Sequence, residues 1–514
     1  MKKILFAVSI ASVVFGSVVA QTSFDDYKKR KDAEFGNFKT QKQKEFESFR
    51  QKKNAEFAEF LRQKWEKYDA KPQVKPKEEK PVPPVIYEDD KKPEPAPAPT
   101  PAPTPQPTPK PQPAPVPVPN PIPIDDEVVV IPKPKPQPEP IEPIVIEDKK
   151  PINTEYIEFY GTKIAVDFPK DDGFRLKGVK DNDFADGWAY LMDDKYDVCI
   201  KSVLDTRSKL QLCDYAYLSM IKTITKKHYG NTNEATFMMG YLLVQSGYKI
   251  RLGHSATKLY VLYASDYNVF NTPFYTLDGV RFYPIDCNEK SLNISSASFE
   301  GESLLSLQIF KEQKLAMNQT PIRNLKSSYG VQTSVCVNKN VIDFYNDYPQ
   351  SYINNDATTT WIAYANTPLE SSVKDKLYPA LKSAINGKSN RDAVNKILNF
   401  VQTAFVYEYD DKVWGRDRAF FATETLYYPS CDCEDRSILF SRLVRDLLGL
   451  DVVLLYYPGH LATAVNIPEL QTGDYLMVNG KRYTVCDPTY INAPVGRTMP
   501  GMDNKVAKVI MLSK

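Results

Sequence analysis

The sequence predicts a mixed α+β protein that follows a helical stalk and a proline-rich linker. Three observations predict this organisation. Aromatic residues recur every 11 residues near the N-terminus, prolines crowd into residues 71–150, and the rest of the chain alternates helical and strand-like apolar patterns. At 514 residues, the chain is long enough for several domains.

Residues 1–20 are typical of a secretory signal peptide. Lys2 and Lys3 precede an apolar run, and Val18-Val19-Ala20 supplies small residues at a cleavage site before Gln21. The alternative is an uncleaved anchor. Since no later stretch is apolar enough to cross a bilayer, we expect a periplasmic or extracellular protein with no transmembrane segment after signal cleavage.

Residues 21–70 predict a helical stalk. Its aromatic pairs are about three helical turns apart, so their rings form one nearly straight stripe. These pairs are Phe24/Tyr27, Phe35/Phe38, Phe46/Phe49 and Phe57/Phe60. We expect residues 24–68 to associate with a second copy, as a coiled coil, or with a partner protein. The alternative is a solvated helix that orders only on binding.

Residues 71–150 predict a disordered linker. Proline alternates there with Ala, Thr, Gln, Lys and Val. This composition favours polyproline II, because proline fixes φ and lacks a backbone donor. Such a linker would hold the following domains far from the stalk. A ligand for a proline-binding domain is the alternative interpretation.

The globular part divides into residues 151–290, 291–385 and 386–514. The expected elements are a strand pair over 156–168, helices over 213–245 and 370–384, and strands up to residue 286. Residues 291–385 predict a strand-rich connecting region of unknown fold. Lys+Arg (66) and Asp+Glu (64) nearly balance, which gives no reason to expect binding to nucleic acid.

The last segment contains the candidate site. Cys433 stands at the start of a predicted helix, whose apolar positions over 438–448 share one face. A helix N-terminus favours a thiolate. His460 begins a predicted strand, and Asp487 closes a hairpin that turns at Asn479-Gly480, a strong type I′ signal.

This order of a helix-borne Cys, a strand-borne His and a strand-end Asp resembles the transglutaminase-like branch of the papain-type cysteine enzymes. The residues that carry the resemblance are Cys433-Glu434-Asp435, Gly459-His460, Asn479-Gly480-Lys481-Arg482-Tyr483 and Asp487-Pro488-Thr489. The resemblance implies a fold in which an N-terminal core helix packs on an antiparallel sheet. It also implies a catalytic Cys433, His460 and Asp487.

In such a site, the Cys433 thiolate attacks an amide carbonyl, His460 moves the proton and Asp487 orients the imidazole. Cys431 is an alternative nucleophile, although the helix register favours Cys433. An upstream side chain would complete the oxyanion hole with the backbone N–H of Cys433. The candidates for that side chain are Tyr427, Tyr428 and Trp414.

We expect Asp432, Glu434 and Asp435 to cap the helix rather than bind a metal. The sequence therefore predicts no metal and no cofactor. An odd number of cysteines leaves at least one thiol unpaired, and the pairing of the others stays open. The seven cysteines are Cys199, Cys213, Cys287, Cys336, Cys431, Cys433 and Cys486.

An earlier part of the chain repeats this order of elements. Leu277–Asp286 parallels Val478–Asp487 around an Asp-Gly or Asn-Gly turn. Equal spacing from the turn places Leu259 at the position of His460 and Asp286 at that of Asp487, and the predicted helix starts place Asn233 at the position of Cys433. We expect a duplicated fold whose first copy, within residues 151–290, is inactive. Unrelated α/β packing is the alternative.

The sequence thus predicts a secreted or periplasmic cysteine enzyme that acts on amide bonds of protein or peptide substrates through a thioester. Hydrolysis is favoured over cross-linking, because water is always present and no amine site is evident. The alternative is a non-catalytic binding or scaffold protein of the cell envelope that uses the same fold.

Overall fold

The computed structural model describes residues 19–76, 79, 81–88, 128–129, 138–141, 146 and 151–513. The predicted signal peptide lies almost wholly outside these residues, as does much of the predicted linker. Among the helices of the described residues, none combines the length and the apolarity that crossing a bilayer requires. The architecture is mixed α+β, which confirms this part of the predicted fold class.

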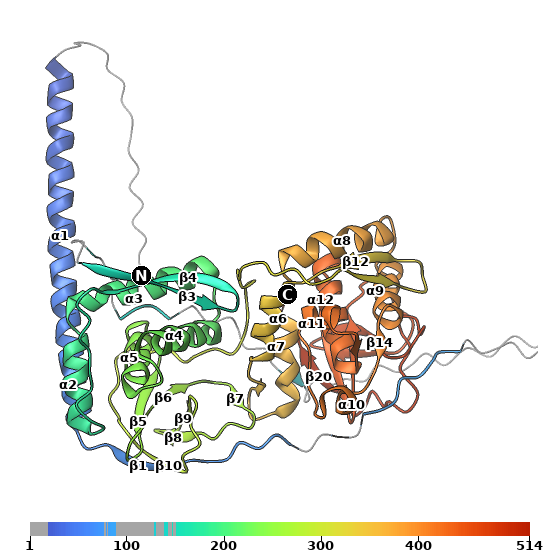
Figure 1. Ribbon diagram of the computed structural model, residues 1–514. Coiled ribbons are helices and arrows are strands. Elements are labelled where there is room, and N and C mark those ends of the chain that lie inside the picture. Colours follow the sequence, from blue (N-terminus) through green and yellow to red (C-terminus); the bar gives the residue numbers. More distant parts are fainter. Residues whose placement is uncertain are drawn as a thin grey trace, which may run out of the picture.

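Helix α1 (Val19–Arg62) extends away from the globular part (Figure 1). At about 1.5 Å per residue, its 44 residues span about 66 Å. The predicted helix in the stalk is confirmed, but it ends before residue 68. The chain then forms strand β1 (Glu66–Asp69), which belongs to the globular part.

The last aromatic pair of the stalk is divided between the core and solvent. Phe57 is buried between Trp188 and Phe299, with ring centroids 4.3 and 4.6 Å away, while Phe60 is 46% exposed. This end of the aromatic stripe therefore contacts its own chain. The sequence predicted a second copy or a partner for this contact.

The first lobe comprises residues 151–294. Its helices are α2 (Asp181–Leu191), η1 (Asp194–Tyr196), α3 (Asp197–Leu210), α4 (Asp214–Tyr229) and α5 (Asn233–Gln245). Its strands are β3 (Ile152–Phe159), β4 (Thr162–Pro169), β5 (Ile250–His254), β6 (Leu259–Ala264), β7 (Asn268–Val269), β8 (Tyr275–Leu277), β9 (Val280–Pro284) and β10 (Ser291–Ile294). The predicted strand pair and the helices α4 and α5 are confirmed, whereas α2, η1 and α3 were not predicted.

The connecting region is more helical than the sequence predicted. Its strands are β11 (Arg323–Lys326), β12 (Gln332–Val335) and β13 (Ser351–Tyr352). Its helices are α6 (Lys339–Asn346), η2 (Ala357–Thr360), α7 (Trp361–Asn366) and α8 (Ser371–Ile385), of which only α8 was predicted. Helices as short as α6 and α7 show too few turns for an apolar periodicity to be read from sequence.

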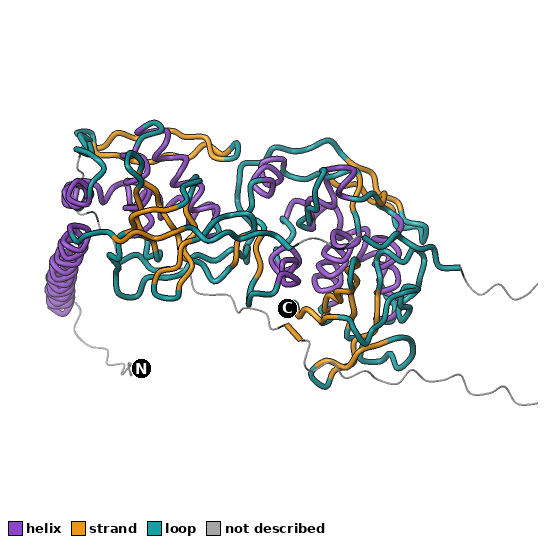
Figure 2. Tube along the Cα trace, turned by 90° about the horizontal axis from the view of Figure 1, so that it is seen from below, coloured by secondary structure: helices purple, strands orange, loops and turns teal. Residues whose placement is uncertain are grey.

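The second lobe comprises residues 390–513 and the short strand β2 (Val128–Val129). Its helices are α9 (Asn390–Thr403), α10 (Asp410–Trp414), α11 (Ala422–Tyr427) and α12 (Cys433–Leu448). Its strands are β14 (Val406–Tyr407), β15 (Ser430–Cys431), β16 (Val452–Tyr457), β17 (His460–Val465), β18 (Tyr475–Val478), β19 (Lys481–Cys486) and β20 (Lys508–Met511). The two lobes lie side by side (Figures 1 and 2).

The main sheets of the two lobes have the same strand order in the described part of the chain. The order is β8-β9-β6-β5-β10-β1 in the first lobe and β18-β19-β17-β16-β20-β2 in the second. In each lobe, one helix (α5 or α12) immediately precedes the two central strands. The outermost pairings differ, since β1 is antiparallel to β10 whereas β2 is parallel to β20.

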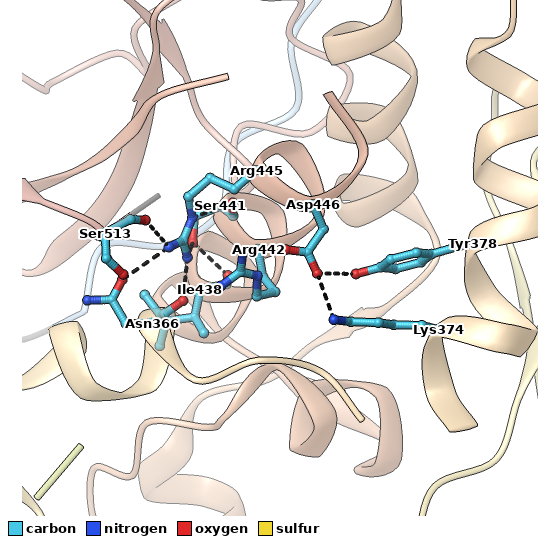
Figure 3. A network of polar contacts seen from close by, with 10 residues as sticks. Asn366, Lys374, Tyr378, Ile438, Ser441, Arg442, Arg445, Asp446 and Ser513 are labelled. Carbon is cyan, nitrogen blue, oxygen red and sulfur yellow. Dashed lines mark hydrogen bonds and ion pairs between the residues drawn. The ribbon is translucent and has the colours of Figure 1, made fainter. Parts of the chain in front are cut away.

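Helix α12 is the central helix of the second lobe. Every residue from Cys433 to Arg445 is buried, and Gly449 ends the helix in a left-handed conformation with φ 65°. Figure 3 shows how its far end is fixed. Arg445 donates to Oδ1 of Asn366 at 3.0 Å and to the carbonyl oxygen of Ser513 at 2.7 Å. These bonds hold the helix that begins with Cys433.

Candidate active site

Cys433 is the first residue of α12, as predicted. The carboxylate of Asp435 accepts from the backbone N–H of Asp432 at 3.2 Å and from that of Phe420 at 2.8 Å. The first bond caps α12, and the second ties the start of this helix to the segment before α11. The predicted capping role is confirmed for Asp435.

His460 and Asp487 are brought together by adjacent strands. His460 begins β17 directly after the Pro458-Gly459 turn, and Asp487 follows the last residue of β19. Their side chains lie 2.9 Å apart, between Nε2 of His460 and Oδ2 of Asp487. The other oxygen of Asp487 accepts from the backbone N–H of Thr489 at 2.8 Å. The bond to Thr489 fixes the carboxylate of Asp487, and this carboxylate in turn orients the imidazole of His460.

The second imidazole nitrogen faces a different environment. Nδ1 of His460 is buried and has no hydrogen-bond partner among the described residues. Cys433 and His460 line the same cavity, whose volume is about 590 Å³. The structure thus brings together the three predicted residues, Cys433, His460 and Asp487. Nε2 of His460 is bonded to Asp487, and Nδ1 has no partner among the described residues.

A second layer of bonds holds these residues. The amide of Gln402 donates to the carbonyl oxygen of Asp487 at 3.0 Å and to that of Tyr490 at 2.7 Å. The buried guanidinium of Arg436 donates to the carbonyl of Phe405 at 2.9 Å. Ser437 Oγ donates at 2.8 Å to the carbonyl of Leu461, the residue after His460. Helix α12 and strand β17 are therefore bonded directly beside the site.

The electrostatic environment of Cys433 differs from the prediction. Burial, together with the carboxylates of Glu434 and Asp432, raises the pKa of its thiol well above the ordinary value. Its Sγ lies 3.0 Å from Oε2 of Glu434. The helix N-terminus favours a thiolate, but the buried carboxylates oppose it. The helix start and the carboxylates therefore act on the thiol in opposite directions.

Cys431, the alternative nucleophile, lies outside the described lining of the cavity. It lies on β15, and its thiol is 3.8 Å from the carbonyl oxygen of Val406. Burial raises the pKa of this thiol to about 11. All seven cysteines, which lie within the described residues, are free thiols, so none forms a disulfide there.

The three predicted oxyanion donors lie outside the described lining of the cavity. Trp414 and Tyr428 pack against the guanidinium of Arg418, 4.3 and 5.2 Å from the ring centroids. Tyr427 packs on Tyr428, with ring centroids 4.9 Å apart.

Tyr407 is the residue that the sequence argument missed. It lies on β14 and pairs with Cys431 on β15. Cys431 is two residues before the candidate nucleophile Cys433. Like the three predicted oxyanion donors, Tyr407 lies outside the described lining of the cavity, but its hydroxyl is buried and has no hydrogen-bond partner in the described structure. Burial and then the nearby Cys433 raise the pKa of this hydroxyl. An isolated strand of two residues leaves no readable periodicity in the sequence.

Buried carboxylates surround the nucleophile. Asp410 and Asp417 join Asp432, Glu434 and Asp435 in groups whose oxygens lie within 4.8 Å of one another. Burial raises the pKa of Glu434 to about 8, with Asp417 adding to the effect. These oxygens could hold a hard cation such as Ca²⁺ or Mg²⁺. The sequence placed three of them at the helix start but missed Asp410 and Asp417.

The first lobe has different residues at the equivalent positions. Asn233 begins α5, and Leu259 begins β6. The amide of Asn233 donates to the carbonyl of Thr257 at 3.1 Å and accepts from the N–H of Leu259 at 2.9 Å. Asp286 is paired with Lys222 at 2.7 Å on the surface. These residues hold the backbone and contain no nucleophile and no base.

Comparisons with protein-family models, with curated proteins and with solved structures found no match to this chain.

Proposed function

We propose that the chain is a transglutaminase-like cysteine enzyme that acts on amide bonds of proteins or peptides. One observation carries the proposal. His460 and Cys433 line the same cavity, the buried Nδ1 of His460 has no hydrogen-bond partner among the described residues, and its Nε2 is held by Asp487. A nucleophile, a base and a group that orients the base are the minimum for acyl transfer through a thioester.

The reaction divides into two halves. In the first, Nδ1 of His460 takes the proton from the Cys433 thiol, the sulfur bonds to the amide carbonyl carbon, and the C–N bond breaks as His460 protonates the leaving amine. In the second half, water attacks the thioester, and the acid and the thiol are released. Asp487 stabilises the imidazolium in both halves.

Tyr407 completes the site in this proposal. Acyl transfer needs donors for the oxyanion that develops on the carbonyl. The backbone N–H of Cys433 at the start of α12 is one donor. The hydroxyl of Tyr407 is a second, because it is buried near Cys433 without a partner in the described chain.

The first lobe is a non-catalytic copy of the second in this proposal. The shared strand order and the helix before the central strands support a duplication. Asn233 and Leu259 can neither attack a carbonyl nor move a proton. The lobe then serves to brace the second lobe or to bind. The signal-like residues 1–20 support a periplasmic or extracellular enzyme.

Peptide cleavage tests the proposal. The protein without residues 1–20 would be incubated with a complex peptide library, and new termini and new cross-links would be read by mass spectrometry. We expect new termini with the parent protein and none with Cys433→Ala, while Cys431→Ala behaves as the parent. Cross-links without new termini would assign transfer to an amine. Neither product, from the parent protein or from a variant whose residues 73–88 are displaced from the cavity, would favour the scaffold alternative.

A further inference from the structure

A segment of the predicted linker lies across the candidate active site. We define the strap as residues 73–88, of which 77, 78 and 80 lie outside the described residues. The sequence predicted a free spacer here. Instead, the strap leaves the first lobe after β1 and runs along the second lobe (Figure 1).

The strap is fixed to the first lobe at its beginning. The carbonyl oxygen of Gln73 accepts from the backbone N–H of Asn271 at 2.8 Å. The amide of Gln73 donates to the hydroxyl of Tyr352 at 2.6 Å. The next residues therefore enter the cavity from a defined point.

The middle of the strap lines the cavity that contains Cys433 and His460. Its lining residues are Lys75, Pro76, Glu79 and Pro81. The ammonium group of Lys75 forms an ion pair with Asp417. This part of the strap occupies space that a substrate would need to reach the thiol.

The end of the strap pairs with the rim of the site through its backbone. The N–H of Val82 donates to the carbonyl oxygen of Gly459 at 3.0 Å, directly before His460. The N–H of Tyr87 donates to the carbonyl of Ile491 at 2.8 Å, and the carbonyl of Val85 accepts from the N–H of Ile491 at 2.8 Å. Extended peptides are recognised by such strand-like pairing.

We propose that the strap is an intramolecular ligand of the substrate cleft that keeps the enzyme latent, and that Lys75 occupies the position of a basic side chain of the substrate peptide. This inference rests on the proposed function. The substrate it predicts is an extended peptide with a lysine or arginine, which must displace the strap before Cys433 can react.

The charges of the cavity support a basic substrate. Lys75 is the only lysine or arginine among its described lining residues. Glu79 belongs to the strap, and the acidic lining residues outside the strap are Asp410, Asp411, Asp417, Asp432 and Glu434. If Lys75 leaves with the strap, Asp417 and its acidic neighbours lose this cation. A cationic side chain of the substrate would then take its place as the partner of Asp417.

The strap is held weakly enough to be displaced. Each neutral hydrogen bond contributes only several-fold to binding. Val74 and Ile86 are largely exposed, and Val82, Val85 and Tyr87 are only partly buried against a small apolar cluster. Its covalent attachment raises its effective concentration at the cleft to about the millimolar range. A tethered, low-affinity ligand therefore blocks the cleft against weak substrates and yields to tight ones.

A triple variant weakens the strap without touching the second lobe. Lys75→Ala removes the ion pair, Tyr87→Ala removes a ring that packs edge-on to Tyr490 at 5.6 Å, and Val82→Pro removes the N–H that bonds Gly459. Val82 already stands between prolines, so this change keeps the extended backbone. Val74→Ala is the matched control, because Val74 is 73% exposed.

The readout is the rate at which Cys433 is modified, followed by peptide mapping. The full chain without residues 1–20 would be treated with a lysine-containing, thiol-reactive peptide probe and separately with iodoacetamide. We expect the peptide probe to modify the triple variant about tenfold faster or more, since each lost contact contributes several-fold. The Val74→Ala control should react at the parent rate.

A synthetic peptide of residues 73–88 gives a second measurement, which also shows whether the triple variant keeps a cleft that binds the strap. Added to the triple variant, it should slow the peptide probe, and the same peptide with Lys75→Glu should slow it less. Equal probe rates in the parent and the triple variant would overturn the strap proposal, as would an unmodified Cys433 in both. Modification that is fast in the triple variant but independent of His460 would instead count against the proposed function alone.

Discussion

Nε2 of His460 lies 2.9 Å from Oδ2 of Asp487, and both side chains are almost completely buried. This pairing fixes one nitrogen of the ring and leaves Nδ1 available on the other side. A buried imidazole with one nitrogen held and one nitrogen open is poised to exchange a proton with a group in the cavity. Cys433 is the thiol in that cavity.

Asp487→Asn should keep the fold and remove most of the activity. Asparagine can accept from Nε2 but carries no charge to stabilise the imidazolium. We expect kcat/KM on a cleaved peptide to fall by a factor on the order of 10² to 10⁴. Asp451→Asn is the matched control, since Asp451 pairs with Lys481 at the surface, and it should retain parent activity. Equal losses in both variants would refute a specific role for Asp487.

Tyr407→Phe should lower kcat while leaving modification of Cys433 by iodoacetamide nearly unchanged. The hydroxyl is needed only when negative charge develops on a substrate carbonyl, which alkylation does not involve. We expect a loss in kcat of about 10²-fold. Tyr409→Phe, which changes a neighbouring ring 5.4 Å from that of Tyr407, should have little effect. A Tyr407→Phe enzyme with normal kcat would exclude Tyr407 as an oxyanion donor.

The candidate triad could be predicted because each member stands beside a local signal. Asn479 and Gly480 adopt positive φ values of 49° and 74°, as a type I′ turn requires, and Gly449 ends the helix of Cys433. These signals fixed the order of helix, strands and hairpin. They also indicated the matching elements of the first lobe, where the structure has a helix followed by strands whose sheet has the same strand order.

The rest of the site depends on contacts that leave no local pattern. Asp410 and Asp417 meet the carboxylates of α12 only in the folded chain. The docking of the strap could not be predicted, because polyproline composition shows that a segment is extended and not where it binds. Helix α2 was missed for a local reason, since Gly187 lowers its helix propensity. That glycine is needed because a Cβ there would lie 2.9 Å from Leu176.

The stability of the protein should fall as the pH rises from about 4.5 to about 7. Burial raises the pKa of Glu424 from its usual 4.5 to about 7, even though Arg418 lies against it. In that window the folded state retains a proton that the unfolded state releases, so the free energy of unfolding decreases with pH. The slope from this one group approaches about 1.4 kcal/mol per pH unit.

Glu424→Gln tests this assignment by chemical denaturation between pH 4.5 and 7.5. Glutamine has no proton to lose, so the decrease with pH should be shallower than in the parent. Glu408→Gln, an exchange of a surface carboxyl whose pKa is lowered by Lys412, should keep the parent slope. An unchanged slope in Glu424→Gln would show that the group is ionised throughout.

The two phenylalanines of the last stalk repeat should differ in their effect on stability. Phe57→Ala removes a buried ring from between Trp188 and Phe299 and should lower the free energy of unfolding by about 3–5 kcal/mol. Phe60→Ala changes an exposed ring and should cost less than about 0.5 kcal/mol. Equal effects in thermal unfolding would contradict the docking of α1 on the first lobe.

The most direct test of a Cys433–His460–Asp487 site is the pH dependence of Cys433 alkylation in the triple variant with the weakened strap. The alkylation rate would be compared between this variant and the same variant that also carries His460→Ala. We predict rapid modification of Cys433 at neutral pH that falls by at least about tenfold in His460→Ala, and a return of reactivity in that variant only at alkaline pH. His254→Ala should react as its parent, since His254 lies outside the described lining of the cavity. Identical rates at neutral pH with and without His460 would contradict the account.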